Sequence, residues 1–210
     1  CQTARKHSDK PQTDKLEIIM AITPEVRLTY VSVDEPKANQ SGVLKYSVGI
    51  LIPKTNKDAI DWFKRQIDAA IEKGIQKGKF NKAGSQNPTF KYPLRDGDAY
   101  YEIATDDKKD SRASYRGHMF VSASSNNKPG IVDRYAKPIF EEGAIYSGVW
   151  AMVDCNFFPF NNSGSIGVGC GLNNIMKRRD DNRLDGRSSD ATSAFASVAD
   201  TEPAGDDDLQ

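Results

Sequence analysis

The chain has 210 residues, of which 38% are hydrophobic and 28% charged, and its formal net charge is zero. That length suits one domain with flexible ends, and the composition argues against a chain that is disordered throughout. Three cysteines without CxxC spacing indicate neither a disulfide framework nor a zinc site, so we expect reduced thiols in a cytoplasmic protein. No apolar stretch reaches the roughly 20 residues that cross a bilayer, and the first residues lack the apolar segment of a signal peptide, so we expect no membrane partner.

The zero net charge hides two regions of opposite sign. Residues 190–210 contain six acidic residues and no lysine or arginine, so this segment carries −6 and the rest of the chain +6. A basic body joined to an acidic tail is typical of a protein that binds a polyanion and carries an interaction tail. The alternative is an ordinary solvated surface with a solubilising end.

Composition also suggests where the folded part begins and ends. Residues 1–19 are polar and without a sustained period, and Met20 resembles a natural chain start. After Met176 the density of apolar residues falls. We predict a disordered N-terminal extension over 1–19, one folded domain over 20–184 and a disordered acidic tail over 185–210.

The first half of the predicted domain contains two strands and one helix. Alternation predicts a strand from Val26 to Tyr30 and, after a turn at 39–42, a second from Leu44 to Ile52. Helical spacing of apolar residues predicts a helix from Thr55 to Lys73, which Thr55 or Asn56 can cap. Residues 78–93 resemble an extended loop, 93–98 a turn, and 106–110 a charged, solvated segment.

The second half is dominated by a hairpin. After strands predicted at 117–123 and 131–133, the longest candidate runs from Ile145 to Phe158, and 165–172 follows across a turn. Five or six strands with an early helix, without alternation of strands and helices, favour a mainly β fold with one or more inserted helices. We predict an OB-fold-like five-stranded barrel.

The predicted hairpin strand has two unlike faces. Val149, Ala151, Val153, Cys155 and Phe157 form an apolar face that suits a core. The opposite face carries Tyr146, Trp150 and Phe158, and exposed aromatics on a strand can stack nucleic-acid bases. The alternative is that these rings face a second core or a subunit contact.

Glycines occupy every second position of the partner strand, at 167, 169 and 171. A stripe without side chains permits either sharp curvature of the strand or a close approach of another backbone. Basic residues gather in loops and at strand ends, some beside aromatic ones, as a phosphate-tracking groove requires. The predicted DNA-binding residues are Lys45, Lys54, Arg112, Tyr115, Arg116, Lys128, Arg134, Tyr146, Trp150, Phe158, Lys177 and Arg178.

Enzymatic interpretations have weaker support. Asp96, Asp98, Asp106, Asp107 and Asp110 lie in turns and charge runs, without a spacing that indicates a nuclease metal site. His7 and His118 suggest no catalytic triad or dyad, and the glycines of 167–169 lie within a hairpin strand rather than in a nucleotide-binding loop. We therefore expect a protein that is not an enzyme and that needs no metal or cofactor.

Several spaced segments resemble a known family: Gly42 to Lys54, Tyr115 to Ser124, Lys128 to Asp133, Tyr146 to Gly148 and Gly167 to Asn174. They are similar to a bacteriophage family, formerly catalogued as a domain of unknown function, of OB-fold single-stranded DNA-binding proteins. The likeness runs from about Thr23 to Ser188. It implies an OB-type barrel, sequence-independent binding of single strands in phage DNA replication or recombination in the host cytoplasm, and no catalytic residues.

The end of the chain suggests a role beyond disorder. Asp206, Asp207, Asp208 and Leu209 place concentrated negative charge beside one apolar residue. This segment could mimic phosphates in the protein's own basic groove, be displaced by DNA, and then dock on replication or recombination proteins. A phage structural or assembly protein and an RNA-binding protein are the alternative functions, and a homo-oligomer is left open.

Overall fold

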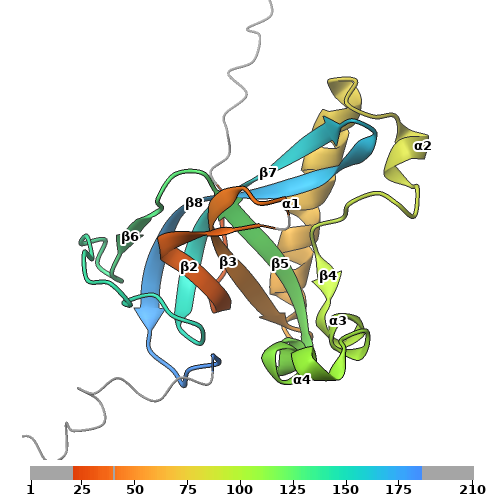
Figure 1. The fold of residues 1–210 in the computed structure, drawn as a ribbon. Coiled ribbons are helices and arrows are strands. Elements are labelled where there is room, and N and C mark those ends of the chain that lie inside the picture. Colours follow the sequence, from red (N-terminus) through yellow and green to blue (C-terminus); the bar gives the residue numbers. More distant parts are fainter. Residues whose placement is uncertain (1–20, 40, 186–210) are drawn as a thin grey trace, which may run out of the picture.

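Five long strands pair in a closed ring in the computed structural model, which describes residues 21–39 and 41–185 (Figure 1). These strands are β2 (Val26–Ala38), β3 (Leu44–Pro53), β5 (His118–Ser125), β7 (Trp150–Asn162) and β8 (Ser165–Arg179). Around the ring, β2 pairs with β3, β3 with β5, β5 with β8, β8 with β7, and β7 with β2. The β5–β8 pairing is parallel and the others are antiparallel. The predicted class, mainly β with inserted helices around five OB-like strands, is confirmed.

Three short strands extend the sheet outside this ring. β1 (Ala21–Ile22) pairs with β7, β4 (Arg95–Asp96) pairs with β5, and β6 (Gly130–Val132) pairs with β8. The predicted strand at 131–133 corresponds to β6. β4 lies in the segment that the sequence predicted as a turn.

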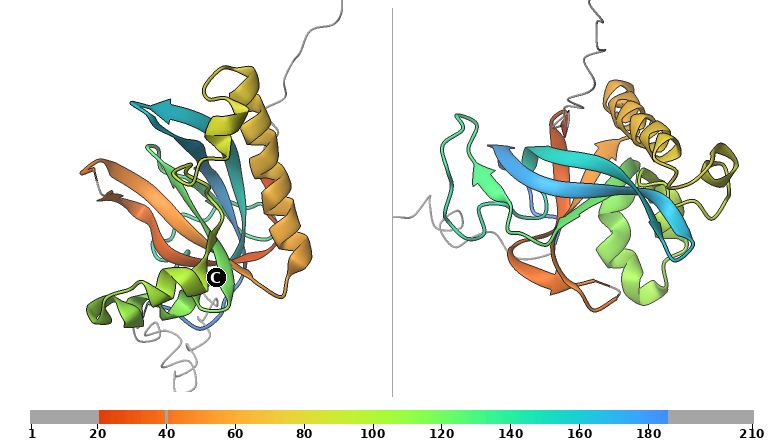
Figure 2. Two further views of the ribbon diagram at one scale, coloured as in Figure 1. Left: turned by 90° about the vertical axis from the view of Figure 1, so that its right-hand side faces the viewer. Right: turned by 90° about the horizontal axis from the view of Figure 1, so that it is seen from above.

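The longest helix, α1 (Lys57–Gln76), connects β3 to the segment before β5. Asn56 caps it, since its side chain accepts a hydrogen bond from the backbone N–H of Ala59. Phe63 and Ile67 are fully buried. The ring centroids of Phe63 and of Phe157 on β7 lie 6.2 Å apart. Figure 2 shows α1 running along one side of the ring. The predicted helix is confirmed and ends three residues later than expected.

Four shorter helical elements lie between α1 and β5. They are α2 (Lys82–Ser85), α3 (Gly97–Glu102), α4 (Asp106–Arg112) and the 3₁₀ helix η1 (Ala113–Tyr115). The sequence predicted a loop at 78–93 and an irregular charged segment at 106–110, so α2 and α4 correct those predictions. Asp96 caps α3, because its carboxylate accepts from the backbone N–H groups of Asp98 and Ala99. A four- or seven-residue helix is too short for apolar periodicity to reveal it. None of the helices described here is both long and apolar enough to span a membrane.

The core fills the inside of the ring. Alternate residues of the strands point inward, so that Leu28, Ile50, Val121 and Val153 are all at most 1% exposed. The inward face predicted for the hairpin strand is confirmed, since Val149, Ala151, Val153 and Cys155 are buried. However, β7 begins at Trp150 rather than at Ile145. Gly148 has φ = +119°, which L-amino acids rarely adopt, and this conformation interrupts the extended chain before the strand.

The predicted boundaries at the two ends remain predictions. Residues 1–20 and 186–210 lie outside the described residues, and with them Met20 and the segment from Asp206 to Leu209. Cys155 and Cys170, the two cysteines that are described, are buried and unbridged.

Candidate nucleic-acid interface

Neighbouring strands β3, β5 and β8 present short side chains on the outside of the ring. The register places Ser47 opposite Ser124, Gly49 opposite Ser122, and Ser124 opposite Gly171. Because side chains alternate along each strand, these residues share the outward face. We call Ser47, Gly49, Ser122, Ser124, Gly169 and Gly171 the small-residue face. In an OB fold, the corresponding face of the second and third strands is the one that binds oligonucleotides.

The glycines of β8 give room to the protein's own neighbouring groups. A Cβ at Gly167 would meet the backbone of Lys91, one at Gly169 would lie 2.6 Å from Cζ of Phe158, and one at Gly171 would meet Asn156. The close approach of another backbone that the stripe permits is observed at Gly167, whereas side chains approach Gly169 and Gly171. The approaching groups belong to β7 and to the segment that contains Lys91.

Phe158 is a supported but accessible aromatic ring. It pairs with Gly169 across the β7–β8 ladder, and its ring lies over that glycine. Its side chain is nevertheless 43% exposed. A ring that is held from one side and open to solvent can stack a base without first being ordered. The structure therefore places one of the three predicted aromatics on the small-residue face.

A hollow of about 430 Å³ lies next to this ring. It is lined by Phe90, Lys91, Tyr92, Pro93, Arg95, Ser122, Val168, Gly169 and Cys170. The backbone of Lys91 holds the segment beside β8, since its N–H donates to Ile166 O and its carbonyl accepts from the N–H of Val168, each at 3.0 Å. Lys91 and Arg95 bring two exposed cations to the hollow.

Arg95 is fixed against the small-residue face. Its Nη2 donates to Oγ of Ser122 at 3.2 Å, and its guanidinium carbon lies 4.3 Å from the centroid of the Phe120 ring. Sequence reasoning missed both Arg95 and Lys91. The available signal was Lys91 between the aromatic residues Phe90 and Tyr92, with Arg95 three residues further on.

Other predicted residues near this face are engaged in internal contacts. Tyr115 is only 5% exposed, in a cluster with Tyr100 and Phe120, and burial raises the pKa of its hydroxyl. The Arg112 guanidinium lies 3.9 Å from the ring centroid of Tyr100, and that of Arg116 lies 5.1 Å from the ring of Tyr101. The contacts of Tyr100 and Tyr115 with Phe120 tie the helical segment to β5, and the two arginine contacts lie within the segment before β5.

Lys54 is already neutralised within the protein. Its Nζ lies 2.7 Å from a carboxylate oxygen of Asp96 and equally close to one of Asp98. Hydrogen bonds from Lys54 hold the pKa values of both carboxyl groups below their ordinary value, and the two carboxylates raise the pKa of Lys54. The two carboxylates neutralise the positive charge of Lys54 and would repel a phosphate group.

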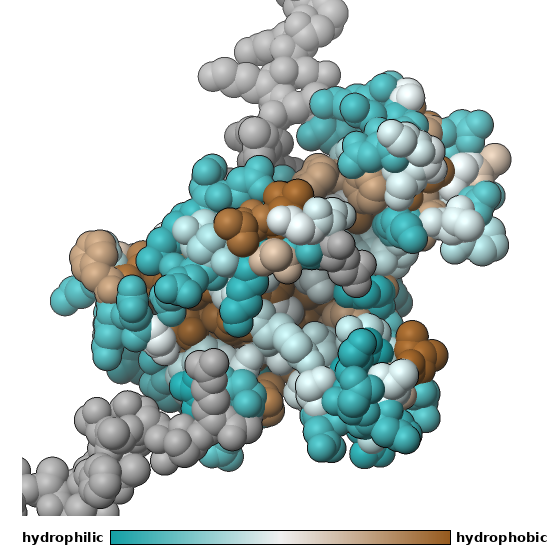
Figure 3. All heavy atoms as spheres, viewed as in Figure 1, coloured by the Kyte–Doolittle hydropathy of each residue, from teal (hydrophilic) through white to brown (hydrophobic). Residues whose placement is uncertain are grey.

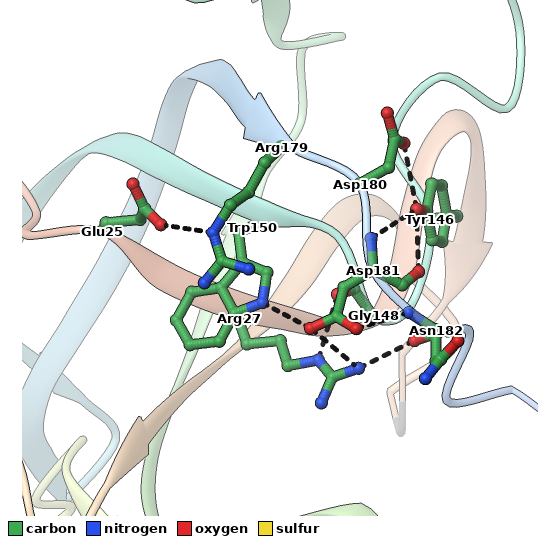
Figure 4. A network of polar contacts seen from close by, with 9 residues as sticks. All are labelled: Glu25, Arg27, Tyr146, Gly148, Trp150, Arg179, Asp180, Asp181 and Asn182. Carbon is green, nitrogen blue, oxygen red and sulfur yellow. Dashed lines mark hydrogen bonds and ion pairs between the residues drawn. The ribbon is translucent and has the colours of Figure 1, made fainter.

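Trp150 begins β7 at the end opposite Phe158, and Tyr146 lies just before it. The chain that follows β8 contacts both residues (Figure 4). The Trp150 indole N–H donates to Oδ2 of Asp181 at 2.7 Å, and the Tyr146 hydroxyl lies 3.0 Å from Oδ1 of Asp180. The guanidinium carbon of Arg179 lies 4.1 Å from the centroid of the Trp150 ring. The two carboxylates are therefore bonded to the side chains that the sequence predicted to stack on DNA bases.

Arg27 completes this network from β2. Its Nη2 donates to the carbonyl of Asn182 at 2.8 Å and lies 3.5 Å from Oδ2 of Asp181. The hydrogen bond from Trp150 is the main cause that lowers the pKa of Asp181, and the positive charge of Arg27 acts in the same direction. The segment over 180–182 is thus held by neutral and by charged donors.

Three predicted cations meet in a second hollow of about 430 Å³. Its lining consists of Asp133, Arg134, Tyr135, Lys177, Arg178, Arg179 and Asp180. Much of its positive charge is compensated, because Lys177 pairs with Asp180 at 2.8 Å and Arg178 with Glu25 at 3.6 Å. Lys45 is half-buried on β3, and Lys128 is exposed in the loop after β5.

In the view of Figure 3, hydrophobic residues at the surface form small, separate groups among hydrophilic ones. Among the described residues, no three His, Cys, Asp or Glu side chains are grouped so that they could hold a metal ion.

An OB-like ring with an open aromatic and two cations beside a small-residue face defines the class of oligonucleotide-binding β proteins. The comparisons identify the group within that class. The family model of the single-stranded DNA-binding protein of Enterobacter phage Enc34 matches residues 19–208, so the chain belongs to this family.

One relative in sequence and two solved structures are similar to the chain. Protein p50 of Acyrthosiphon pisum secondary endosymbiont phage 1 is 30% identical over 167 residues, which cover 77% of this chain and 84% of that protein. The Enc34 protein in complex with single-stranded DNA matches with a TM-score of 0.57 and 24% identity, over 76% of this chain and 85% of that one. The single-stranded DNA-binding protein gp2.5 of bacteriophage T7 matches with a TM-score of 0.51 and 11% identity, over 81% and 97%. The two solved structures share their fold with this chain.

Proposed function

We propose that this protein binds single-stranded DNA during phage DNA replication or recombination, without sequence preference and without catalysing a reaction. The observation that carries the proposal is the half-exposed ring of Phe158, supported by Gly169 at the edge of the small-residue face. Family membership and the DNA-bound Enc34 relative support it.

The strand would cross the small-residue face, with a base stacked on Phe158 and phosphates near Lys91 and Arg95. Short side chains let the sugar–phosphate chain approach the sheet closely. Every base has a π-face, so stacking is tolerant of sequence, and phosphate contacts carry no sequence information. Both kinds of contact favour binding without base specificity.

The acidic tail would compete with DNA for this face. Once DNA has displaced it, the tail would bind replication or recombination proteins. Leu184 supports this role by its position. Its N–H donates to Ser147 O at 2.8 Å, and its side chain packs against the cluster that contains Leu51 and Phe120. Leu51 and Phe120 form the ladder pair next to Gly49 and Ser122. Leu184 therefore lies beside the small-residue face, and 26 residues of the sequence follow it.

Titration of the full chain with fluorescent oligo-dT, at two salt concentrations, tests the proposal. We expect binding that weakens steeply with salt, because each neutralised phosphate of a single strand contributes about −0.7 to the slope of log K against log salt. Duplex DNA and an RNA oligomer of equal length serve as competitors. Absence of oligo-dT binding at low salt contradicts the proposal, and stronger competition by RNA redirects it to an RNA-binding function.

A further inference from the structure

Tyr30 combines a rare backbone conformation with an exposed aromatic side chain. Its φ is +46°, in the left-handed region that residues other than glycine seldom occupy. It lies on β2 where the register with β3 shifts, between Thr29 and Ser32. Residues are held in such conformations when their surroundings fix them, and they cluster at functional sites.

Two contacts fix the Tyr30 side chain. Its hydroxyl donates to the carbonyl of Ser111 in α4 at 2.7 Å. Its ring stacks on Tyr115, with the centroids 5.7 Å apart and the planes inclined by 28°. Tyr115 is buried, whereas Tyr30 is 50% exposed. Tyr115 thus supports the Tyr30 ring from one side, much as Gly169 lies under Phe158.

This ring stands at the Gly49 end of the small-residue face. Thr29, the neighbour of Tyr30, is paired with Gly49, and its Cγ2 would lie 2.8 Å from a Cβ there. The Tyr115 hydroxyl lies 3.5 Å from the same point. Phe158 stands at the other end, beside Gly169.

The two rings are far enough apart to serve different bases. Going from β2 through β3 and β5 to β8, over which the Phe158 ring lies, crosses three interstrand spacings of about 4.8 Å, or about 14 Å along the curved sheet. Stacked bases of one strand rise by only about 3.4 Å each. Several nucleotides fit between the rings.

We propose that Tyr30 is a second base-stacking residue, which holds the bound strand at the Gly49 end of the face. This inference rests on the proposed DNA-binding function and adds a residue to it. The backbone conformation presents the ring, and the contacts to Ser111 and Tyr115 order it before DNA arrives, so binding does not pay for its immobilisation.

The test compares Tyr30→Gly with the unmodified chain, because glycine adopts a positive φ without strain and removes only the side chain. With oligo-dT, we expect affinity to fall by about 5- to 150-fold, the range of one lost stacked base. With an abasic oligomer of the same length, which keeps the phosphates but offers no bases, the two proteins should bind equally. Tyr30→Phe keeps the ring and should retain most of the oligo-dT affinity.

Phe140→Ala is the matched control, since Phe140 is a 91% exposed aromatic in the loop between β6 and β7 and lies outside the proposed interface. It should bind both oligomers as the unmodified chain does, and thermal unfolding should show that all variants are folded. The inference is overturned if Tyr30→Gly binds oligo-dT normally, or if it loses equal affinity for both oligomers. Failure of the unmodified chain to bind oligo-dT is a different result, which overturns the proposed function.

Discussion

The ring of Phe158 occupies the space that a side chain at Gly169 would need, with Cζ only 2.6 Å from the position of the missing Cβ. The two residues face each other across the β7–β8 ladder. Because Gly169 has no side chain, the Phe158 ring can pack directly against the backbone of β8. The small residue and the large one act as a unit.

Gly169→Ala should weaken DNA binding by displacing the Phe158 ring. Phe158→Ala should weaken it by about 1 to 3 kcal/mol, the value of one stacked base. Because both changes remove the same platform, the double variant should bind about as well as Phe158→Ala alone. Fluorescence anisotropy with oligo-dT measures the cycle. Additive losses would show that Gly169 acts by another route.

Arg95→Ala should reduce the salt dependence of binding. Removal of one phosphate contact lowers the slope of log K against log salt by about 0.7 for a single strand. Lys54→Ala is the matched control, because its charge is already paired with Asp96 and Asp98. Titrations at four salt concentrations give the slopes. A lower slope for Lys54→Ala, with that of Arg95→Ala unchanged, would reverse the two assignments.

Acid should release the segment over 180–182 from Trp150. The hydrogen bond from the Trp150 indole lowers the pKa of Asp181 below its ordinary value of 3.8. A carboxyl with a lowered folded-state pKa stabilises its contact above that ordinary value, and the stabilisation is lost as pH falls through the lowered pKa. The contact should therefore persist at pH 5 and break below pH 3.8.

Fluorescence of Trp150 can report this transition, since the chain has only two tryptophans and Trp62→Phe leaves one. Asp181→Asn in the same background is the control and should remove the acid transition. A midpoint at or above pH 3.8 would contradict the assignment of the lowered pKa to Asp181.

Truncation after Ser189 should tighten DNA binding at low salt, because it removes the negative charge that we propose competes for the small-residue face. Replacing Asp206, Asp207 and Asp208 by asparagine in the full-length chain should reproduce part of the gain without changing the length. The effect should shrink as salt screens the charges. Unchanged or weaker affinity of the truncated protein would count against competition by the tail.

Alternation along the strands was sufficient to predict several strands and the inward face of β7, because burial on one side imposes a period of two. It could not predict what covers the outward face. Trp150 and Phe158 share that face but are eight residues apart, about 26 Å along a strand. Asp181 contacts the first, and the second remains open.

The interface residues that the sequence did not reveal come from segments without a period. Lys91 and Arg95 reach the small-residue face because their segment pairs with β8 and β5, and these are contacts between residues distant in the chain. For Lys54, the sequence shows a basic residue beside a strand but not its ion pairs with Asp96 and Asp98. Tyr30 was assigned to a regular strand, and a positive φ leaves no mark on apolar alternation.

The anchoring of Leu184 to Ser147 has a consequence for how the tail can act. A tail that follows this anchor would compete, as proposed, within the same molecule, at an effective concentration set by the length of the tether rather than by the amount of protein. Dilution cannot remove such a competitor. The DNA concentration needed to displace the tail would then be the same when the protein is scarce as when it is abundant.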